Sequence, residues 1–333
     1  MLVPIMFLLA SAGIIYLSCE IFVNGVEWLG RKLDVSQTAT GTILAAFGTA
    51  LPESVVTLVA TAFGEHEAQK QIGIGAALGG PLVLSTIAYG VVGACLVVFG
   101  SRLGREKRVT VEVDGRRLSR DQAWFFCIFV FKIALGLVVF SMKPWLGFAF
   151  LAAYAWYFWT EMKGPGKTAE GDLEPLTIRP HESAPHIAWV IAQTVGATVV
   201  IFVASRVFVV QLEALGPWLG LSPQVTALLL SPIATEMPET MNALIWVRQG
   251  KERLALANIS GAMMIQATVP TAFGLFFTPW LLDRTLLVAA GITGLSIVFL
   301  FTAFRRGQVS GTVLSQVGWL YGVFGLVALA LRR

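Results

Sequence analysis

The sequence contains few charged residues. Only 13% of its 333 residues are Asp, Glu, Lys or Arg, whereas a soluble globular domain carries about 25%. Hydrophobic residues make up 56% and the mean hydropathy is +0.74. Cysteine is also scarce, and three scattered cysteines in apolar runs exclude a disulfide framework. This composition predicts an integral membrane protein.

Enzyme motifs are missing as well. There is no H-E-x-x-H pair, and the three histidines, His66, His181 and His186, lie in or beside predicted loops. The glycines of residues 73–79 miss the G-x-G-x-x-G spacing of a dinucleotide-binding turn and open an apolar run without a preceding strand, so close helix packing is the better interpretation. We therefore predict no enzymatic activity and no cofactor.

Ten apolar stretches are long enough to cross a membrane as helices, which takes about 20 residues each. Outer-membrane strands are excluded, because they are about half as long and alternate in polarity. No basic residue precedes the first stretch, so we interpret it as a membrane helix and not as a removed signal peptide. The stretches are 2–23, 38–62, 72–99, 122–140, 144–161, 186–210, 222–247, 254–278, 284–303 and 311–331.

Basic residues lie mainly on one side of these stretches. The segments after the odd-numbered stretches hold 17 of the 24 Lys and Arg residues, and the segments on the opposite side hold five. Because cytoplasmic loops are enriched in Lys and Arg, we expect a multi-pass protein of the plasma (inner) membrane with both termini outside. The net charge of +4 is then explained by contact with membrane lipid. No nucleic-acid partner is predicted, and nothing indicates a protein partner.

Two polar segments have features of their own. Residues 109–118 alternate in polarity around Asp114-Gly115, which predicts a small β-hairpin. Residues 162–185 are rich in Gly and Pro and are predicted to form a flexible cytoplasmic linker. This linker divides the chain into a first five-helix repeat, 1–161, and a second five-helix repeat, 186–333.

The two halves carry matching motifs. Residues 47–53 read F-G-T-A-L-P-E and residues 233–239 read I-A-T-E-M-P-E, so that Thr, Pro and Glu coincide at a shift of 186 positions. Because each half has an odd number of helices, the second would enter the membrane upside down. Inverted repeats are typical of secondary transporters, whose substrate site lies near the middle of the membrane at interrupted helices. The sequence thus predicts an all-α integral membrane protein with ten transmembrane helices in two inverted five-helix repeats.

Glu53 and Glu239 are the central candidates for the site. A charged side chain at membrane depth costs about 3 kcal/mol on insertion scales, and such residues usually mark an ion pathway. Each glutamate follows a proline, which leaves a backbone carbonyl without its helical donor. Thr49 and Thr235 lie four residues earlier on the same helix faces. Clustered oxygen atoms of this kind are the ligands of calcium and similar hard cations.

Residues 48–53 and 234–239 resemble the paired signatures of the calcium/cation antiporter superfamily, which includes the sodium/calcium exchangers. Residues 254–262 resemble a further segment of that superfamily, A-x-G-N-x-x-G-S-N. The resemblance implies a cation antiporter with the predicted five-plus-five arrangement and external termini. The positions that match its metal ligands are Glu53, Glu239, Thr49 and Thr235.

Other positions depart from the superfamily pattern. The serine that follows each threonine is Ala50 in the first half and Glu236 in the second. The first G-S-N-x-x-N segment reads G-G-P-L-V-L over residues 79–84 and loses its last ligand. The second reads G-A-M-M-I-Q and ends in Gln266 in place of Asn. We therefore add Glu236 and Gln266 to the predicted metal ligands.

These departures bear on the ions that are exchanged. Ala50 lacks a hydroxyl that would bind sodium, and Glu236 adds a third intramembrane carboxylate next to Glu239. A carboxylate that takes up a proton when the metal leaves would give metal/proton exchange. We expect a secondary active antiporter for Ca²⁺ or a similar divalent ion, such as Mn²⁺ or Mg²⁺, with H⁺ or Na⁺ as the coupling ion. The alternative is a transport-inactive relative that senses metal or assembles with a partner.

Overall fold

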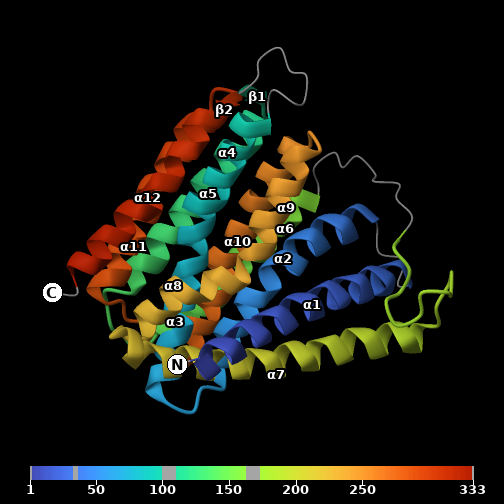
Figure 1. The fold of residues 1–333 in the computed structure, drawn as a ribbon, viewed down its shortest axis with the longest axis horizontal. Coiled ribbons are helices and arrows are strands. Elements are labelled where there is room, and N and C mark those ends of the chain that lie inside the picture. Colours follow the sequence, from blue (N-terminus) through green and yellow to red (C-terminus); the bar gives the residue numbers. More distant parts are fainter. Residues whose placement is uncertain (1, 33–36, 100–109, 163–172, 332–333) are drawn as a thin grey trace.

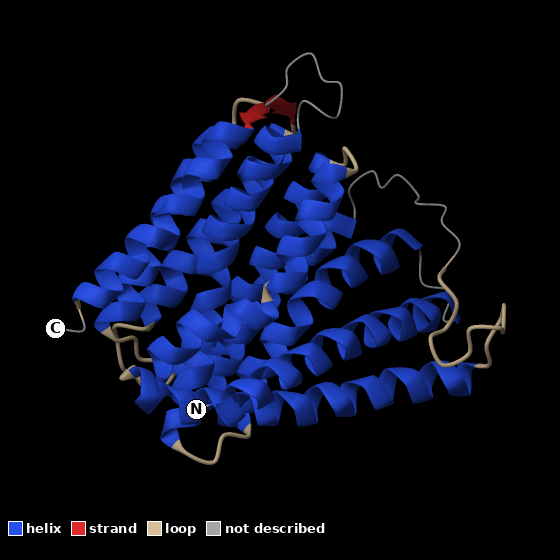
Figure 2. Ribbon diagram, viewed as in Figure 1, coloured by secondary structure: helices blue, strands red, loops and turns tan. Residues whose placement is uncertain are grey.

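The computed structural model describes residues 2–32, 37–99, 110–162 and 173–331, and within them it leaves out the side chains of 37–49, 161–162, 233–234, 238 and 329. Over these residues it is helical apart from one two-stranded sheet (Figures 1 and 2). The elements are α1 (Leu2–Lys32), α2 (Gln37–Ala62), α3 (Glu67–Val83), the π-helical turn η1 (Leu84–Ala88), α4 (Tyr89–Phe99), β1 (Thr110–Glu112), α5 (Gly115–Leu135), the 3-10 turn η2 (Lys143–Trp145), α6 (Leu146–Met162), α7 (Ile187–Leu219), α8 (Pro223–Thr235), α9 (Met237–Arg248), α10 (Glu252–Phe277), α11 (Arg284–Phe304), β2 (Gln308–Ser310) and α12 (Gly311–Ala330).

Each of the ten predicted stretches overlaps helix. The described helices that are long and apolar enough to cross a membrane are Leu2–Leu29, Glu67–Phe99, Ile187–Leu219, Glu252–Phe277, Arg284–Phe304 and Gly311–Ala328.

The other four stretches fall short of a full span for identifiable reasons. Helix α6 has only 17 residues, and α5 includes Arg120, Asp121 and Lys132. The 222–247 stretch is divided between α8 and α9, and the apolar part of α2 is described only from Ala50.

The outer faces of these helices are apolar. On α1 and α7, large hydrophobic side chains point away from the protein, where a soluble protein would place charge. Such a surface is suited to lipid, and together with the six long apolar helices it makes this a multi-pass membrane protein. The exposed residues on these two helices include Leu2, Phe7, Leu17, Val195, Val199 and Val203.

The helices form two packed groups. In Figure 1, α1 and α7 lie side by side along one flank, and α4, α5, α11 and α12 form the opposite flank. One cluster of buried hydrophobic side chains joins α1, α2 and α7 to α3 and α8, and a second joins α3 through α6 to α8 through α12. Helices α3 and α8 contribute to both clusters, so the boundary between the two groups runs through them.

Close packing of α3 on α8 explains the glycines of residues 73–79. A Cβ atom on Gly75 would lie 2.0 Å from the carbonyl oxygen of Gln224, and one on Gly79 would lie 2.7 Å from that of Leu228. Only glycine allows the two backbones to approach this closely. The interpretation of these glycines as packing positions is confirmed.

The hairpin predicted at 109–118 is wrong. β1 pairs antiparallel with β2, near the other end of the chain, with Thr110 opposite Ser310. Asp114, expected in the turn, is the N-cap of α5 and accepts a hydrogen bond from the backbone N–H of Arg117 at 3.0 Å. An Asp-Gly pair suits a hairpin turn and a helix start equally well, and here the capping bond decides between them.

The described part of the predicted linker, residues 173–185, packs against α1 and α7; residues 163–172 lie outside the description. Leu176 is fully buried between these helices. The side-chain oxygen of Asn24 on α1 accepts from the backbone N–H of Thr177 at 3.1 Å and from Gln193 on α7 at 2.9 Å. This segment therefore ties α1 to α7 and is not a free linker.

Candidate ion-binding site

Glu53 lies in the second half of α2, directly after Pro52, and its side chain is fully buried. Its Oε2 accepts a hydrogen bond from the Thr235 hydroxyl at 2.6 Å. Its Oε1 has no hydrogen-bond partner among the described residues. Because an ionised carboxylate is costly to bury without full pairing, this position calls for a cation or a proton.

Thr235 and Glu236 lie where the helix of the second half is interrupted. α8 ends at Thr235, α9 begins at Met237, and Glu236 lies between them with φ −101° and ψ −3°. Pro238 has no N–H to continue the hydrogen-bond ladder, and a proline also disfavours helical geometry in the residue before it. The interruption places the polar groups of the two half-helices inside the protein, as in known transporter sites.

One hydroxyl connects two buried carboxylates. Besides its bond to Glu53, Thr235 Oγ1 lies 3.1 Å from Glu236 Oε1. A hydroxyl has a single proton, so it cannot donate fully to both acids, and the charges of Glu53 and Glu236 repel each other. Gln266 of α10 donates through Nε2 to Glu236 Oε2 at 2.6 Å, while the Gln266 Oε1 accepts no hydrogen bond from the residues that the structure describes.

Gly80 of α3 forms a wall of this site. A Cβ atom there would lie 2.6 Å from Gln266 Oε1 and 3.0 Å from Glu236 Oε1. Without a side chain at this position, two oxygen atoms that carry negative or partial negative charge lie directly against the backbone of α3. Carboxylate and amide oxygens are the ligands that calcium and magnesium prefer, so the residues present fit a divalent cation.

Two hydroxyls extend the polar surface by one helical turn on each side. Thr57 follows Glu53 by four residues on α2, and Ser231 precedes Thr235 by four residues on α8. Both hydroxyl oxygens are buried and make no hydrogen bond within the described part of the chain. Ser231 is not among the predicted residues, although its spacing of four from Thr235 is a usable signal.

The sequence matches the family of sodium/calcium exchanger proteins over residues 3–163 and 189–331, which together cover most of the chain. The chain belongs to the sodium/calcium exchanger family. The predicted superfamily is therefore confirmed, and the family consists of transporters and not of enzymes.

Relatives and solved structures agree with this membership. The inner membrane protein YrbG of Escherichia coli (strain K12) is 25% identical to this exchanger over 327 residues, which are 93% of this chain and 92% of that protein. The crystal structure of the H⁺/Ca²⁺ exchanger CAX matches with a TM-score of 0.75 at 17% identity, over 99% of this chain and 86% of that one. The sodium-calcium exchanger NCX_Mj matches with a TM-score of 0.59 at 18% identity, over 97% of both chains. The exchanger fold is thus shared at low sequence identity.

Of the six predicted ligands, the structure brings together Glu53, Thr235, Glu236 and Gln266. Glu239 is fully buried in the first turn of α9. No three Asp, Glu, His or Cys side chains in the described residues converge as a metal-binding group. Thr49 is part of α2, but its side chain lies outside the description.

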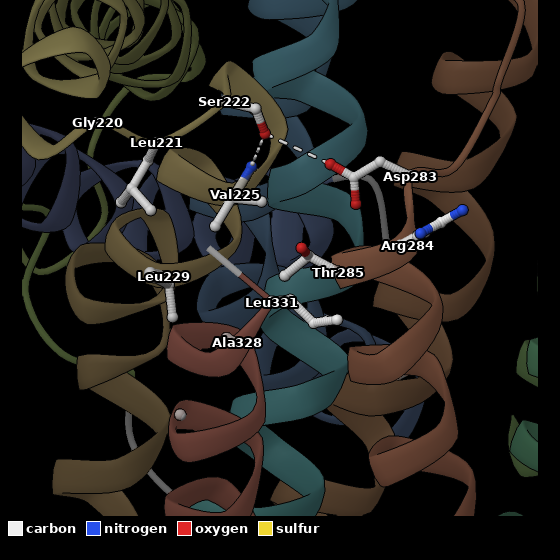
Figure 3. A pocket seen from close by; sticks show the side chains of 11 residues that line it. Gly220, Leu221, Ser222, Val225, Leu229, Asp283, Arg284, Thr285, Ala328 and Leu331 are labelled. Carbon is white, nitrogen blue, oxygen red and sulfur yellow. Dashed lines mark hydrogen bonds between the residues drawn. The ribbon is translucent and has the colours of Figure 1, made fainter. Parts of the chain in front are cut away.

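A separate cavity of about 610 Å³ lies between α8, α11 and α12 of the exchanger (Figure 3). At its rim the Ser222 hydroxyl donates to Asp283 Oδ2 at 3.4 Å. Both residues cap helices, Ser222 at the start of α8 and Asp283 at the start of α11. None of the predicted ligands lines this cavity, so it is distinct from the candidate ion-binding site.

Proposed function

We propose that this exchanger is a secondary active antiporter that moves Ca²⁺ or a similar divalent cation across the membrane in exchange for H⁺ or Na⁺. The observation that carries the proposal is the pair of buried acids, Glu53 and Glu236, that share the Thr235 hydroxyl beside unpaired oxygens. The proposed ligands are Glu53, Glu236, Thr235 and Gln266, with Glu239 and Thr49 joining them when the cation is bound.

The proposed topology is ten crossings in two inverted halves with both termini outside. Contacts between loops on the predicted cytoplasmic side support it. The third and ninth loops pair through β1 and β2. Trp28, at the end of α1, donates to the carbonyl of Glu174 in the fifth loop at 3.0 Å. Arg253, after the seventh loop, donates to the carbonyl of Glu112 in the third at 3.0 Å.

The even-numbered loops contact one another in the same way. The N–H of Leu282 in the eighth loop donates to the carbonyl of Gly136, which follows α5 near the fourth loop, at 3.2 Å. Gln224, next to the sixth loop, donates to the carbonyl of Leu281 at 3.1 Å. Odd-numbered loops thus contact one another, and so do even-numbered loops. Ten crossings of the membrane require this arrangement. The separate family matches of the two halves, 3–163 and 189–331, support the repeat.

In the proposed cycle, a divalent cation binds between Glu53 and Glu236 and removes their mutual repulsion. Thr235 and Gln266 supply neutral oxygens, and the interruption between α8 and α9 keeps buried backbone groups near the ion. When the cation leaves, protons on the carboxylates restore neutrality inside the low-dielectric interior. Alternating access then follows from movement of α1 and α7, which pack as a unit, against the rest of the protein.

H⁺ is the favoured coupling ion in this proposal. Ala50 is fully buried beside the site region and has no hydroxyl to offer sodium. The equivalent position of the second half is Glu236, a group that binds a proton or a metal. Two buried acids that share one hydroxyl need a positive charge both with and without the bound metal. In the metal-free state a proton supplies this charge, because no sodium ligand remains at position 50.

Flux measurements in proteoliposomes test the proposal. Metal uptake by the wild-type protein should be driven by a pH gradient and not by a sodium gradient, over a panel of Ca²⁺, Mn²⁺ and Mg²⁺. Glu53→Gln and Glu236→Gln should each abolish it. Glu213→Gln is the matched control, because Glu213 on α7 accepts from the amide of Gln69 at 2.7 Å outside the site and should keep its flux.

Uptake that follows sodium alone would overturn the choice of coupling ion. Metal binding to the wild-type protein without any flux would favour the transport-inactive alternative, which membership in a family of exchangers does not favour. Full activity of both glutamine variants would refute the assignment of the site.

A further inference from the structure

Lys132 is a fully buried lysine that the proposed function does not use. It lies in the last turn of α5, and its side chain has no exposed surface. Its Nζ donates to the carbonyl oxygen of Ala77 on α3 at 3.0 Å and lies 5.2 Å from the ring centroid of Phe129. The indole of Trp280 donates to the Lys132 carbonyl at 3.0 Å and holds the helix end in place.

The bond to Ala77 has a reason in the sequence. In an α-helix, the carbonyl of Ala77 would accept from the N–H four residues later, but that residue is Pro81, which has none. Lys132 supplies the missing donor. A neutral donor could do the same without the cost of a buried charge, so this bond alone does not account for a lysine.

The charge of Lys132 acts on the ion-binding site. Lys132 and Glu53 lie close enough for a positive charge on the lysine to attract the carboxylate. Its partner Ala77 lies three residues before Gly80, whose backbone forms the wall beside Gln266 and Glu236. Lys132 is therefore bonded to α3 about one helical turn before Gly80, and its contacts with Ala77 and Trp280 hold it in place.

We propose that Lys132 is a built-in cation of the ion-binding site, which weakens the binding of the transported cation and so promotes its release. This inference rests on the proposed function. Buried carboxylates in a low-dielectric interior would hold a divalent ion too tightly for rapid exchange, and a positive charge nearby opposes that attraction. Lys132 is in this role a positioning residue that acts through the field in the site and does not touch the ion.

A charge effect leaves a signature that a structural effect lacks. The repulsion between Lys132 and an ion in the site is proportional to the charge of the ion. Removing the ammonium group should therefore change the binding free energy of a divalent cation about twice as much as that of a monovalent one. Loss of the Ala77 bond by itself would disturb the site for both kinds of ion alike.

The test is equilibrium binding of Ca²⁺ to purified full-length protein in detergent at neutral pH, where Lys132 can carry its charge, with Na⁺ affinity from competition. Lys132→Met should bind Ca²⁺ about tenfold more tightly, which corresponds to about 1.4 kcal/mol. It should bind Na⁺ only about threefold more tightly. Lys132→Gln keeps a donor for Ala77 without the charge and should shift in the same direction, whereas Lys132→Arg should stay near wild type.

Lys143 provides a matched control. It is also buried, and its Nζ donates to the carbonyls of Val138, Pro279 and Trp280 at 2.7–3.0 Å. Lys143→Met therefore removes a buried ammonium from carbonyl partners away from the site, and its Ca²⁺ affinity should remain within about twofold of wild type.

The outcomes separate the two proposals. If the wild-type protein binds Ca²⁺ and the uncharged Lys132 variants bind it with equal or lower affinity, the role of Lys132 is refuted while the proposed function stands. An equal fold-change in Ca²⁺ and Na⁺ affinity in these variants would also refute the role of Lys132. If wild-type protein binds none of the divalent cations tested, the proposed function itself fails, and the role of Lys132 fails with it.

Discussion

Gly80→Ala is the sharpest perturbation that the site offers, because it adds one methyl group and no charge. The new Cβ would lie 2.6 Å from Gln266 Oε1, 2.9 Å from Gln266 Cδ and 3.0 Å from Glu236 Oε1. Real Cβ contacts are not this short, so a neighbour must move. The neighbours are the ends of flexible side chains and not backbone, so the helices can keep their places while the two ligands shift.

The size of the effect follows from these distances. To reach an ordinary contact of 3.4 Å, the Gln266 oxygen must retreat from the 2.6 Å position by about 0.8 Å. Its amide then loses much of the 2.6 Å bond to Glu236. A hydrogen bond to a charged group contributes about 1.5–3 kcal/mol, so we expect metal affinity to fall roughly tenfold to a hundredfold.

Calcium binding and thermal unfolding should be measured on three alanine variants together. Gly80→Ala should lose affinity with little change in stability. Gly261→Ala, on α10, meets nothing within 4 Å and should be silent in both assays. Gly79→Ala would meet the Leu228 carbonyl at 2.7 Å and the Pro232 ring, which belong to a packed helix, so it should lose stability. Wild-type affinity of a folded Gly80→Ala protein would show that Gly80 does not border the ion.

Two further variants test other contacts. Thr235→Val removes the hydroxyl between the two acids at nearly constant volume and should lower calcium affinity roughly tenfold in a calorimetric titration. Thr235→Ser keeps a hydroxyl and should keep the wild-type affinity. Equal calcium affinities of the two variants would contradict the shared-hydroxyl arrangement. Asn24→Ala loses the bonds to Thr177 and Gln193 and should destabilise the protein by roughly 1–3 kcal/mol. The midpoint of thermal unfolding in detergent should fall, while calcium affinity stays unchanged. An unchanged midpoint would show that these bonds do not stabilise the protein.

The sequence was sufficient for the helices but not for the contacts between their ends. Apolar stretches of about 20 residues are long-range signals, and each one overlaps helix in the structure. The error at residues 109–118 arose because Asp114-Gly115 satisfies the local rules of a hairpin and of a helix start. What decided the outcome was the partner strand, Gln308–Ser310, almost 200 residues away. No local pattern contains that information.

The candidate site was predictable where it followed from the matching motifs of the two halves. Matching positions in the two halves pointed to Glu53 and Thr235, and the departures from the superfamily pattern pointed to Glu236 and Gln266, all of which the structure brings together.

Lys132 escaped prediction for a different reason. Its role depends on two facts about α3 that become visible only when the helices are packed: Pro81 leaves the Ala77 carbonyl without a donor, and Gly80 brings the same helix against the ligands. In the sequence, the lysine is a single charge in an apolar stretch more than 50 residues from either.

The asymmetry between the two halves connects these observations. The equivalent positions Ala50 and Glu236 follow the two threonines, and prolines follow at equivalent positions in both halves. Yet α2 continues through its proline, whereas the second-half helix breaks at Glu236. The backbone of Glu236 keeps its bonds to Pro232 and Thr240, and its carboxylate is held by Thr235 and Gln266. Ala50 has no polar side chain to offer. The acid that departs from the superfamily serine therefore stands at the point where the helix is interrupted, so that side-chain chemistry and local structure change together.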